Sequence, residues 1–331
     1  MKKVKIAQIG TSKNSHGKVI WQSLIKQNDV FEVVGFALPE NEKEKFPKEV
    51  KVFEGYREMT VDEILSDPEI EAVAVETEEI YLTKYALMVA KAGKHLHMEK
   101  PGGTCLADFE ELVDVLKEKG LTFSTGYMYR FNPIISKVLN KVKNGELGKI
   151  YSVEAQMNCH HSAETKKWLG CFEGGMMFFL GCHLIDLIYQ IQGEPEEVIP
   201  MNTSTGIDEI SSKDFGMAVF KYKNGVSFAK TTAVDRGGYL RRQLVICGEK
   251  GTVEIKPLEF YIGDKHGTVL NESYESGWNI PWKTSQSELY DRYDTMTRNF
   301  AEMIRGKENP YSYDYEYNLY KLILKACGKE I

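Results

Sequence analysis

The 331-residue sequence has no concentrated basic surface, no C-x-x-C pair, and no repeated or low-complexity segment. Its formal net charge of −6 argues against nucleic acid as a partner, because phosphate binding requires clustered Lys and Arg side chains. The six cysteines are scattered, which is typical of reduced thiols in a cytosolic protein and not of a disulfide framework.

Long apolar runs are scarce as well. The N-terminal segment MKKVKIAQIG passes directly into a strand-like pattern and lacks the apolar stretch of a signal peptide. The most apolar segment, residues 174–193, contains His, Asp and Gln side chains, which argues against a membrane span. With 42% hydrophobic and 27% charged residues, the composition predicts a globular, cytoplasmic protein. A chain of this length is too long for one core, so we expect two domains.

Strand-like and helix-like patterns alternate in the first part of the chain. This order predicts βαβ units and a parallel sheet covered on both faces, a doubly wound Rossmann domain over residues 1–127. The expected strands are 3–9, 31–38, 71–77, 95–100 and 121–127, and the expected helices are 18–27, 60–66, 81–92 and 105–119. In the helix at 60–66, Thr60 and Glu63 have the spacing of a capping box.

The pattern changes after residue 130, where strands follow one another with little helix between them. Such strands usually pair antiparallel, and Lys223-Asn224-Gly225 predicts a hairpin because Asn-Gly readily takes positive φ angles. A long helix at 174–192 is expected to cover one face of this sheet. The predicted fold class is therefore α/β, with an N-terminal Rossmann domain and a second α/β domain over residues 128–331 whose large sheet is mostly antiparallel.

The loop GTSKNSHG, residues 10–17, joins the first strand to the first helix, where such a sheet receives a phosphate. It departs from G-x-G-x-x-G because Ser12 replaces the middle glycine and the third glycine is displaced to Gly17. Ser, Thr and Asn can donate hydrogen bonds to phosphate, so we interpret the loop as a pyrophosphate site; an ordinary surface loop is the alternative.

The end of the second strand offers Leu38, Pro39 and Glu40, and no Arg or Lys before Lys43. An acid at this place binds the ribose hydroxyls of NAD, whereas a basic residue favours the 2′-phosphate of NADP. Glu40 therefore favours NAD, and NADP is not excluded.

Two further segments place ionisable groups where chemistry is expected. Lys100, in Glu99-Lys100-Pro101, lies at the carboxyl edge of the parallel sheet and is poised to meet a substrate hydroxyl; a surface lysine is the alternative. His183 and Asp186 are three residues apart on one side of an apolar helix, and they form either part of an active site or a polar pair in a core. The spacing of Cys159, His160, His161, Cys171 and Cys182 matches no standard zinc pattern, so we expect no metal site.

These motifs resemble the glucose-fructose oxidoreductase, inositol dehydrogenase and MocA (Gfo/Idh/MocA) family. The resemblance rests on AGKHLHMEKP, YMYRFNP, GELGKIYSVEA, GGMMFFLGCHLIDL and NFAEMIRGKENP, which follow the family's order over most of the chain. It implies a Rossmann domain, a second domain with a large mostly antiparallel sheet, and homodimers or homotetramers. It also implies hydride transfer between a nicotinamide cofactor and a sugar, cyclitol or sugar derivative.

Site residues follow from the resemblance together with the loop positions. Lys100 is expected to polarise the reacting oxygen, His183 to take or return the hydroxyl proton, and Asp186 to orient a partner or bind a second hydroxyl. The residues expected to bind NAD are Gly10, Thr11, Ser12, His16, Gly17, Glu40, Thr77, Glu99 and Lys100. Those expected to bind substrate are Lys100, Arg130, His160, Trp168 and Asp186.

Two departures from the family pattern leave other functions open. Phe179 stands where family enzymes often carry an aspartate four residues before the histidine, and a phenyl ring cannot hold a proton. TEEIYL, residues 77–82, replaces the usual T-P-N-x-x-H. The alternatives to a dehydrogenase are an NAD-using enzyme that cleaves glycosidic bonds, a hydrolase or lyase, and a non-catalytic relative that binds a sugar or nucleotide.

Overall fold

A computed structural model describes residues 2–331 and divides them into two compact units. The first consists of the residues up to Tyr127 together with Tyr293–Tyr320, and the second of Met128–Arg292 together with Lys321–Ile331. The first unit ends at Tyr127, where the domain boundary was expected. Residues 293–320, which were expected in the second domain, belong to the first unit instead. Periodicity identifies a C-terminal helix without indicating which of two apolar surfaces it covers, so the sequence alone could not assign this segment.

The first unit contains the predicted parallel sheet, and its five strands lie in the order β2-β1-β3-β4-β5. The order reverses between β1 and β3, and open α/β sheets bind their ligands beyond the carboxyl ends of the strands at such a point. The strands are β1 (Val4–Ile9), β2 (Phe31–Ala37), β3 (Ala72–Val75), β4 (His95–Met98) and β5 (Phe123–Thr125).

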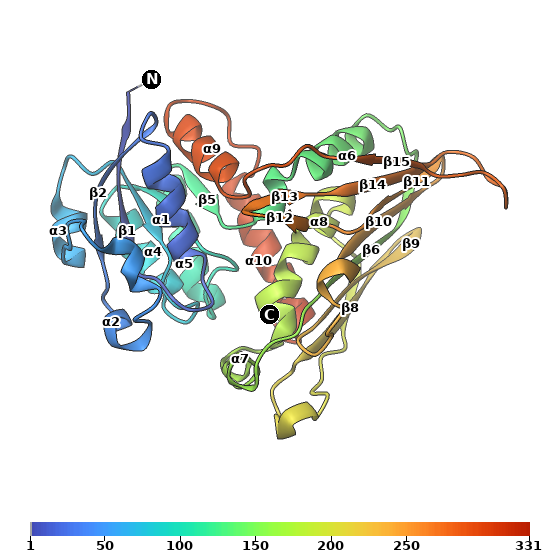
Figure 1. Ribbon diagram of the computed structural model, residues 1–331, viewed down its shortest axis with the longest axis horizontal. Helices are drawn as coiled ribbons and strands as arrows, with labels where there is room; N and C mark the ends of the chain where they lie inside the picture. The colour runs from blue at the N-terminus through green and yellow to red at the C-terminus, as the bar shows by residue number, and fades with distance from the viewer. Residues whose placement is uncertain (1) are drawn as a thin grey trace. The chain divides into compact units, whose positions relative to one another are not determined.

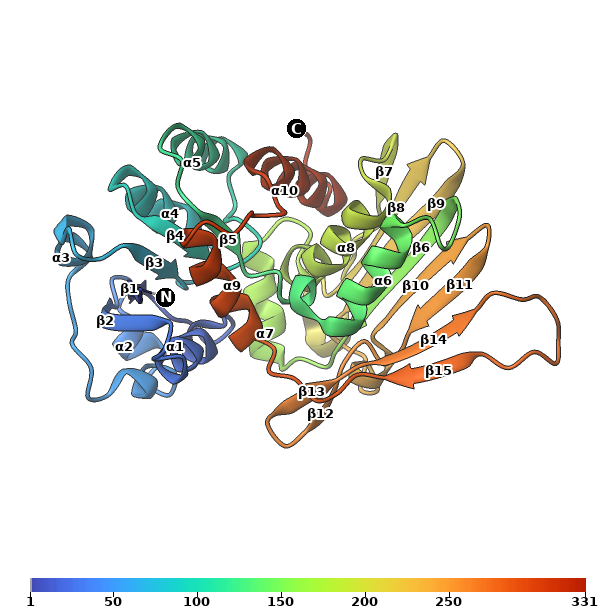
Figure 2. The ribbon, with the colours of Figure 1, turned by 90° about the horizontal axis from the view of Figure 1, so that it is seen from above.

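Helices cover both faces of this sheet, with α1 on one face and α4 and α5 on the other (Figure 2). The helices are α1 (Gly17–Lys26), α2 (Glu42–Lys45), the 3₁₀ helix η1 (Val50–Phe53), α3 (Val61–Ser66), α4 (Leu82–Lys91), α5 (Leu106–Glu118), α9 (Asp294–Ile304) and the first part of α10 (Tyr313–Cys327). The capping box at α3 is confirmed: Glu63 N donates to Thr60 Oγ1 at 3.1 Å, and Thr60 N donates to the Glu63 carboxylate at 2.7 Å.

Specific polar contacts attach the returning segment to the first unit. Ser23 Oγ of α1 donates to Asp294 Oδ1 of α9 at 2.7 Å. Arg305, just after α9, donates to both carboxylate oxygens of Glu71 at 2.8 and 3.1 Å. Because the partners are some 230 to 270 residues apart in sequence, these bonds complete the first unit only once the end of the chain is in place.

The second unit contains an eight-stranded sheet in the order β15-β14-β11-β10-β6-β9-β8-β7 (Figures 1 and 2). Only β6 and β9 pair in parallel, so the predicted, mostly antiparallel sheet is confirmed. Its strands are β6 (Ile150–Asn158), β7 (Glu197–Pro200), β8 (Phe215–Tyr222), β9 (Gly225–Thr232), β10 (Gln243–Gly248), β11 (Gly251–Ile255), β14 (Val269–Ser273) and β15 (Lys283–Gln286); β12 (Phe260–Ile262) and β13 (Lys265–Gly267) form a separate ribbon.

The hairpin between β8 and β9 lies at the predicted place, but its turn is Lys223-Asn224, and neither Asn224 nor Gly225 has a positive φ. Gly225 already belongs to β9, and a Cβ atom there would lie 1.9 Å from the carbonyl oxygen of Tyr151. Close approach of the neighbouring backbone, and not turn geometry, therefore requires this glycine.

One face of the large sheet carries α6 (Pro133–Lys143) and α8 (Cys182–Gln192), as Figure 2 shows. The single helix predicted over 174–192 is instead a π-helical turn, η4 (Met177–Gly181), followed by α8. A π turn adds one residue to the helical period and is frequent at functional sites. The remaining helices are η2 (Met128–Phe131), α7 (Ala163–Trp168), η3 (Leu169–Cys171), η5 (Ile207–Glu209) and η6 (Tyr239–Arg241). None of the helices in residues 2–331 is both long and apolar enough to cross a membrane.

Candidate functional site

The loop between β1 and α1 has the geometry of a phosphate loop although its motif is incomplete. Gly10 has a φ of +81°, and a Cβ atom there would lie 2.3 Å from the Thr77 side chain. A Cβ atom on Gly17 would lie 2.9 Å from Thr11 Oγ1 and 3.0 Å from Glu76, so this glycine allows α1 to approach the end of β3. These are the roles of the first and last glycines of a dinucleotide loop, the tight turn and the close helix–strand contact.

Polar groups inside the loop fix its shape. Ser12 Oγ accepts hydrogen bonds from Asn14 N and Ser15 N at 3.2 and 2.8 Å. Behind the loop, Gln8 Nε2 donates to the carbonyl oxygens of Gly10 and Gly17, both at 3.0 Å. The buried Thr11 hydroxyl has no hydrogen-bond partner among residues 2–331, which fits a loop whose polar groups await a ligand. Gln8 was missed by the sequence analysis; its signal was an amide inside an otherwise apolar buried strand.

The carboxylate of Glu99 joins this loop to the segment that follows β4. His16 donates to Glu99 Oε2 from its backbone N at 3.0 Å, and the His16 ring Nδ1 lies 2.7 Å from the same oxygen. Burial alone would raise the pKa of Glu99, but His16 and Lys100 outweigh it and keep the pKa below its ordinary value. The Glu99 carboxylate therefore already accepts a hydrogen bond from one backbone N–H group at the start of α1. The same carboxylate holds the His16 ring in place.

Lys100 is buried, with 1% of its surface exposed, so it is not a surface lysine. Its Nζ lies 3.9 Å from Glu99 Oε1. Burying an ammonium group costs free energy unless anionic groups lie close to it. Here the anionic groups lie at the carboxyl edge, where such sheets bind ligands.

Two more acids lie at the same edge, and the sequence analysis did not assign them to the site. Glu76 and Glu79 follow β3, and both are fully buried. We refer to Glu76, Glu79, Glu99 and Lys100 as the carboxyl-edge cluster. Burial, with the Glu99 and Glu79 charges, raises the pKa of Glu76 well above its ordinary value. Burial likewise raises the pKa of Glu79 to about 8, although Lys100 opposes this shift.

Glu40 lies beyond the end of β2, where the ribose-binding acid was expected. Its Oε1 accepts hydrogen bonds from the Tyr85 hydroxyl at 2.6 Å and from Lys84 Nζ at 2.8 Å. Burial would raise the pKa of Glu40, but these two bonds outweigh it and lower the pKa. Glu42 Oε2 accepts from the backbone N of Glu40 at 2.6 Å, so two acids occupy this strand end.

In the second unit, Arg130 and Asp186 bind each other. Arg130 Nε lies 3.1 Å from both Asp186 carboxylate oxygens, and its Nη2 lies 2.8 Å from Oδ1. Gln190 Nε2, one turn further along α8, donates to Asp186 Oδ2 at 2.9 Å. Because both side chains are buried, this pair connects η2 to α8, and the predicted substrate ligand Arg130 is bound to the predicted catalytic residue Asp186.

His183 is also buried on α8, with its ring at right angles to that of Tyr129 at a centroid distance of 5.5 Å. The Tyr129 hydroxyl donates to Glu259 Oε1 at 2.9 Å, and Glu259 forms ion pairs with Arg242 and Arg292. This network positions the aromatic neighbour of His183. It was not predicted, because Glu259 and Arg242 lie more than 110 residues from Tyr129 and no local pattern marks them.

Phe179 packs in an aromatic cluster with Trp168 and His161. Its ring is perpendicular to Trp168 at 5.1 Å and lies 6.0 Å from His161. Burial lowers the pKa of His161 to about 4, so this imidazole is neutral at physiological pH. Trp168 is partly buried, whereas His160, the other predicted substrate ligand on this side, is exposed. Among residues 2–331, no three His, Cys, Asp or Glu side chains are grouped to hold a metal ion.

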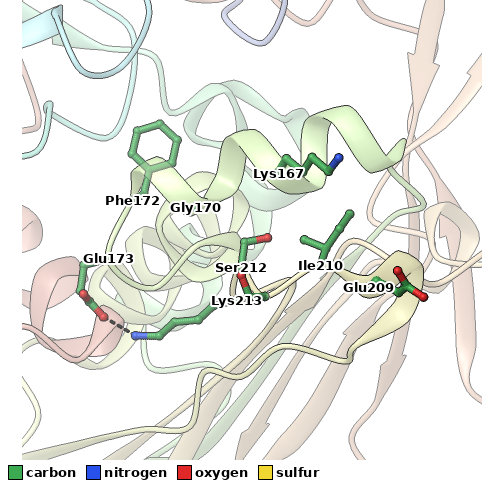
Figure 3. Close-up of a pocket in the computed structure, with 9 residues that line it drawn as sticks. Lys167, Gly170, Phe172, Glu173, Glu209, Ile210, Ser212 and Lys213 are labelled. Carbon is green, nitrogen blue, oxygen red and sulfur yellow. Dashed lines mark hydrogen bonds and ion pairs between the residues drawn. The ribbon is translucent and has the colours of Figure 1, made fainter.

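A cavity of about 410 Å³ lies near α7 within the second unit (Figure 3). Phe172, Ile210 and Ser212 contribute to its wall, and an ion pair between Lys213 and Glu173 crosses one end. None of the predicted site residues lines it, and its charged side chains of opposite sign largely compensate one another. It is therefore separate from the groups described above.

Comparison with known families identifies both units. Residues 4–127 match the model described as "Oxidoreductase family, NAD-binding Rossmann fold", and residues 135–254 match the "GFO/IDH/MocA C-terminal domain". The chain belongs to the Gfo/Idh/MocA family. Its first unit is thus an NAD-binding Rossmann domain, and the resemblance inferred from the motifs is confirmed.

Similar members of the Gfo/Idh/MocA family include oxidoreductases. The chain is 34% identical over 139 residues to the uncharacterized oxidoreductase YhhX of Escherichia coli (strain K12), a match that covers 42% of the chain and 40% of YhhX. It is 27% identical over 167 residues to myo-inositol 2-dehydrogenase of Thermotoga maritima, covering 49% of each. The aldose-aldose oxidoreductase of Caulobacter crescentus, solved with glycerol, has the same fold, with a TM-score of 0.79 at 18% identity over 99% of this chain and 98% of that one.

Proposed function

We propose that this Gfo/Idh/MocA protein is an NAD-dependent dehydrogenase that acts on a CH–OH group of a sugar, cyclitol or sugar derivative. One observation carries the proposal: Lys100, a buried ammonium group, lies at the carboxyl edge of the NAD-binding sheet, against Glu99. A lysine at this edge is placed where it can polarise a substrate hydroxyl beside a nicotinamide ring.

The proposed roles of the site residues follow from their surroundings. Lys100 polarises the substrate oxygen, and His183 takes or returns the hydroxyl proton. Asp186 contributes through Arg130, as a positioning residue that holds α8 and His183 in place. The loop residues Gly10, Thr11 and Ser12, with Thr77 behind Gly10, hold the pyrophosphate, and Glu40 binds the adenosine ribose. When bound, the nicotinamide supplies hydride transfer.

The experiment that tests this function follows NADH formation by absorbance while the protein is incubated with NAD⁺ and a panel of hexoses, cyclitols and anhydrosugars. We expect net NADH formation with at least one of them. Cleavage of a glycoside without net NADH would support the glycoside-cleaving alternative instead. Binding of NADH with no reaction on any substrate or glycoside would support the non-catalytic one.

We expect NADH to bind at least about tenfold more tightly than NADPH, a difference of about 1.4 kcal/mol. The anionic Glu40 would repel a 2′-phosphate, and Lys43, Lys45 and Lys84 all have acidic partners, Glu58, Glu78 and Glu40. Fluorescence titration of both nucleotides measures the ratio. Glu40→Gln should reduce this ratio of affinities, whereas Glu44→Gln, at an exposed position of α2, should leave the ratio unchanged. Equal affinity of the wild type for both nucleotides would contradict the assignment.

We also propose that the protein works in a reducing compartment, the cytoplasm, as a homodimer or homotetramer. The face of the large sheet opposite α6 and α8 bears Val219, Phe228 and Val245, which are half-buried and lie in register across three strands with Glu154 between the last two. Such a face is suited to pack against its own copy. Light scattering of the purified protein would test the assembly, and fractionation of cells would test the location.

A further inference from the structure

The carboxyl-edge cluster contains more acid than Lys100 alone can compensate. Glu99 is the anion paired with His16 and Lys100. Burial and the charges of Glu99 and Glu79 raise the pKa of Glu76, whose Oε1 lies 3.6 Å from His97 Nε2. Glu79 remains as a third buried carboxyl group, and neither of its oxygens has a hydrogen-bond partner among residues 2–331. Glu76 also lacks a hydrogen-bond partner in the described part of the chain but lies near His97, so Glu79 is the buried carboxyl group of this edge that points most directly to a ligand.

The order of the strands indicates which part of the cofactor faces this group. In a Rossmann sheet the adenosine ribose lies at the end of β2 and the pyrophosphate at the start of the helix after β1. Because the sheet order is β2-β1-β3-β4-β5, the rest of the dinucleotide extends across the ends of β3 and β4. Glu79 follows β3 and Lys100 follows β4, so both lie on the nicotinamide side of the first unit.

We propose, on the basis of the function proposed above, that Glu79 is the charge-compensating group of the nicotinamide site, ionised while the oxidised cationic ring is bound and protonated once the ring is neutral. The oxidised ring carries one positive charge and the reduced ring carries none. A net charge in a buried site costs free energy. A carboxyl group that is ionised beside the cationic ring and protonated beside the neutral ring avoids this cost in both states.

The proton and electron balance of the reaction is consistent with this role. In the oxidation direction the substrate C–H bond breaks and its electron pair leaves with the hydrogen as hydride, which reduces the nicotinamide. The substrate O–H bond breaks, a C=O bond forms, and the proton, taken first by His183, ends on Glu79. Glu79 keeps the proton until the reduced cofactor leaves, so the net charge of the buried region is the same before and after the reaction.

The ionisable groups that act on Glu79 come from both strand ends. Lys100 favours its ionised form, whereas Glu99, Glu78 and Glu76 oppose it. An ion pair with Lys45, at 3.0 Å, largely compensates the negative charge of Glu78. Burial places the pKa of Glu79 at about 8, within the range where a bound cation or its absence decides the charge state. Because the cation favours the carboxylate, NAD⁺ affinity should rise as the pH rises through this value, whereas NADH affinity should not.

The test measures nucleotide binding and not turnover. We expect the affinity for NAD⁺ to rise roughly twenty- to thirtyfold between about pH 6.5 and about pH 9.5, and the affinity for NADH to change less than about twofold. Isothermal titration calorimetry in two buffers of different ionisation enthalpy should show release of close to one proton on binding NAD⁺ at neutral pH. Glu79→Gln should remove both the pH dependence and the proton release, whereas the control Glu78→Gln should retain them.

The possible outcomes separate this inference from the proposed function. If both nucleotides bind with the same pH profile, or if Glu79→Gln keeps the rise for NAD⁺, Glu79 has no such role and the dehydrogenase proposal stands. If neither nucleotide binds, both proposals fail. The comparison of NAD⁺ with NADH on the wild-type protein is decisive even if Glu79→Gln does not fold.

Discussion

Lys100→Met is expected to reduce kcat/KM at least about a hundredfold, the usual contribution of a group that handles protons at the reacting atom. The side chain is buried beside Glu99, and methionine preserves most of its volume while removing the charge. Loss of the cation should also raise the pKa values of Glu76 and Glu79 further, because Lys100 lowers both. Initial rates on the substrate found by the panel, together with a thermal melt, measure the two effects.

Lys94→Met is the matched control for this experiment. Lys94 is also buried in the first unit, at the opposite end of β4, and its Nζ donates to the carbonyl oxygens of Asp67 and Ile70 at 2.7 and 2.9 Å. Its replacement should lower the melting temperature but keep kcat/KM within about threefold. If Lys100→Met stays equally active, or if both variants lose activity in proportion to their stability, Lys100 is structural and has no place in the chemistry.

Arg130→Met is expected to destabilise the protein by about 3–5 kcal/mol, because it leaves the Asp186 carboxylate buried without its cation. Urea denaturation measures the loss. Arg241→Met is the control, because Arg241 forms an exposed ion pair with Asp235, and such pairs contribute at most about 1 kcal/mol. If Arg130→Met lowers the free energy of unfolding by no more than Arg241→Met does, the buried pair has no structural role.

The double variant Arg130→Met with Asp186→Leu decides between the two roles considered for Asp186. Replacing both partners with apolar groups of similar size removes the unpaired charge, so much of the stability should return. If Asp186 only positions α8, activity should return with stability. A stable but inactive double variant would instead show that Asp186 or Arg130 contacts the substrate, as the sequence analysis expected.

The fold was predictable because its signals are local. Alternating strand and helix patterns indicate a parallel sheet, and the Thr60–Glu63 spacing indicates a capping box, without any knowledge of distant residues. The glycines of the β1–α1 loop were recognised for the same reason, since their positions follow directly from the strand before them and the helix after them.

The composition of the site was less predictable because it depends on distant pairs. Glu76 and Glu99 meet only because β3 and β4 are neighbours in the sheet, and Arg130 meets Asp186 across 56 residues. The π turn before His183 was also invisible, since the apolar pattern of residues 174–193 fits one continuous helix equally well. Phe179 lies within this π turn, and its ring packs with Trp168 and His161.

The return of residues 293–320 to the first unit affects the order in which a ribosome can complete the protein. Residues 1–127 emerge first, yet Asp294 and Arg305, which bind Ser23 and Glu71, emerge only after the whole of residues 128–292 has been made. At about 5–20 residues per second, the nascent Rossmann unit waits roughly ten to thirty seconds for its last helix. During that interval the chain exposes surface that α9 later covers, so a nascent chain stalled before residue 293 is a natural client for chaperones that bind apolar segments.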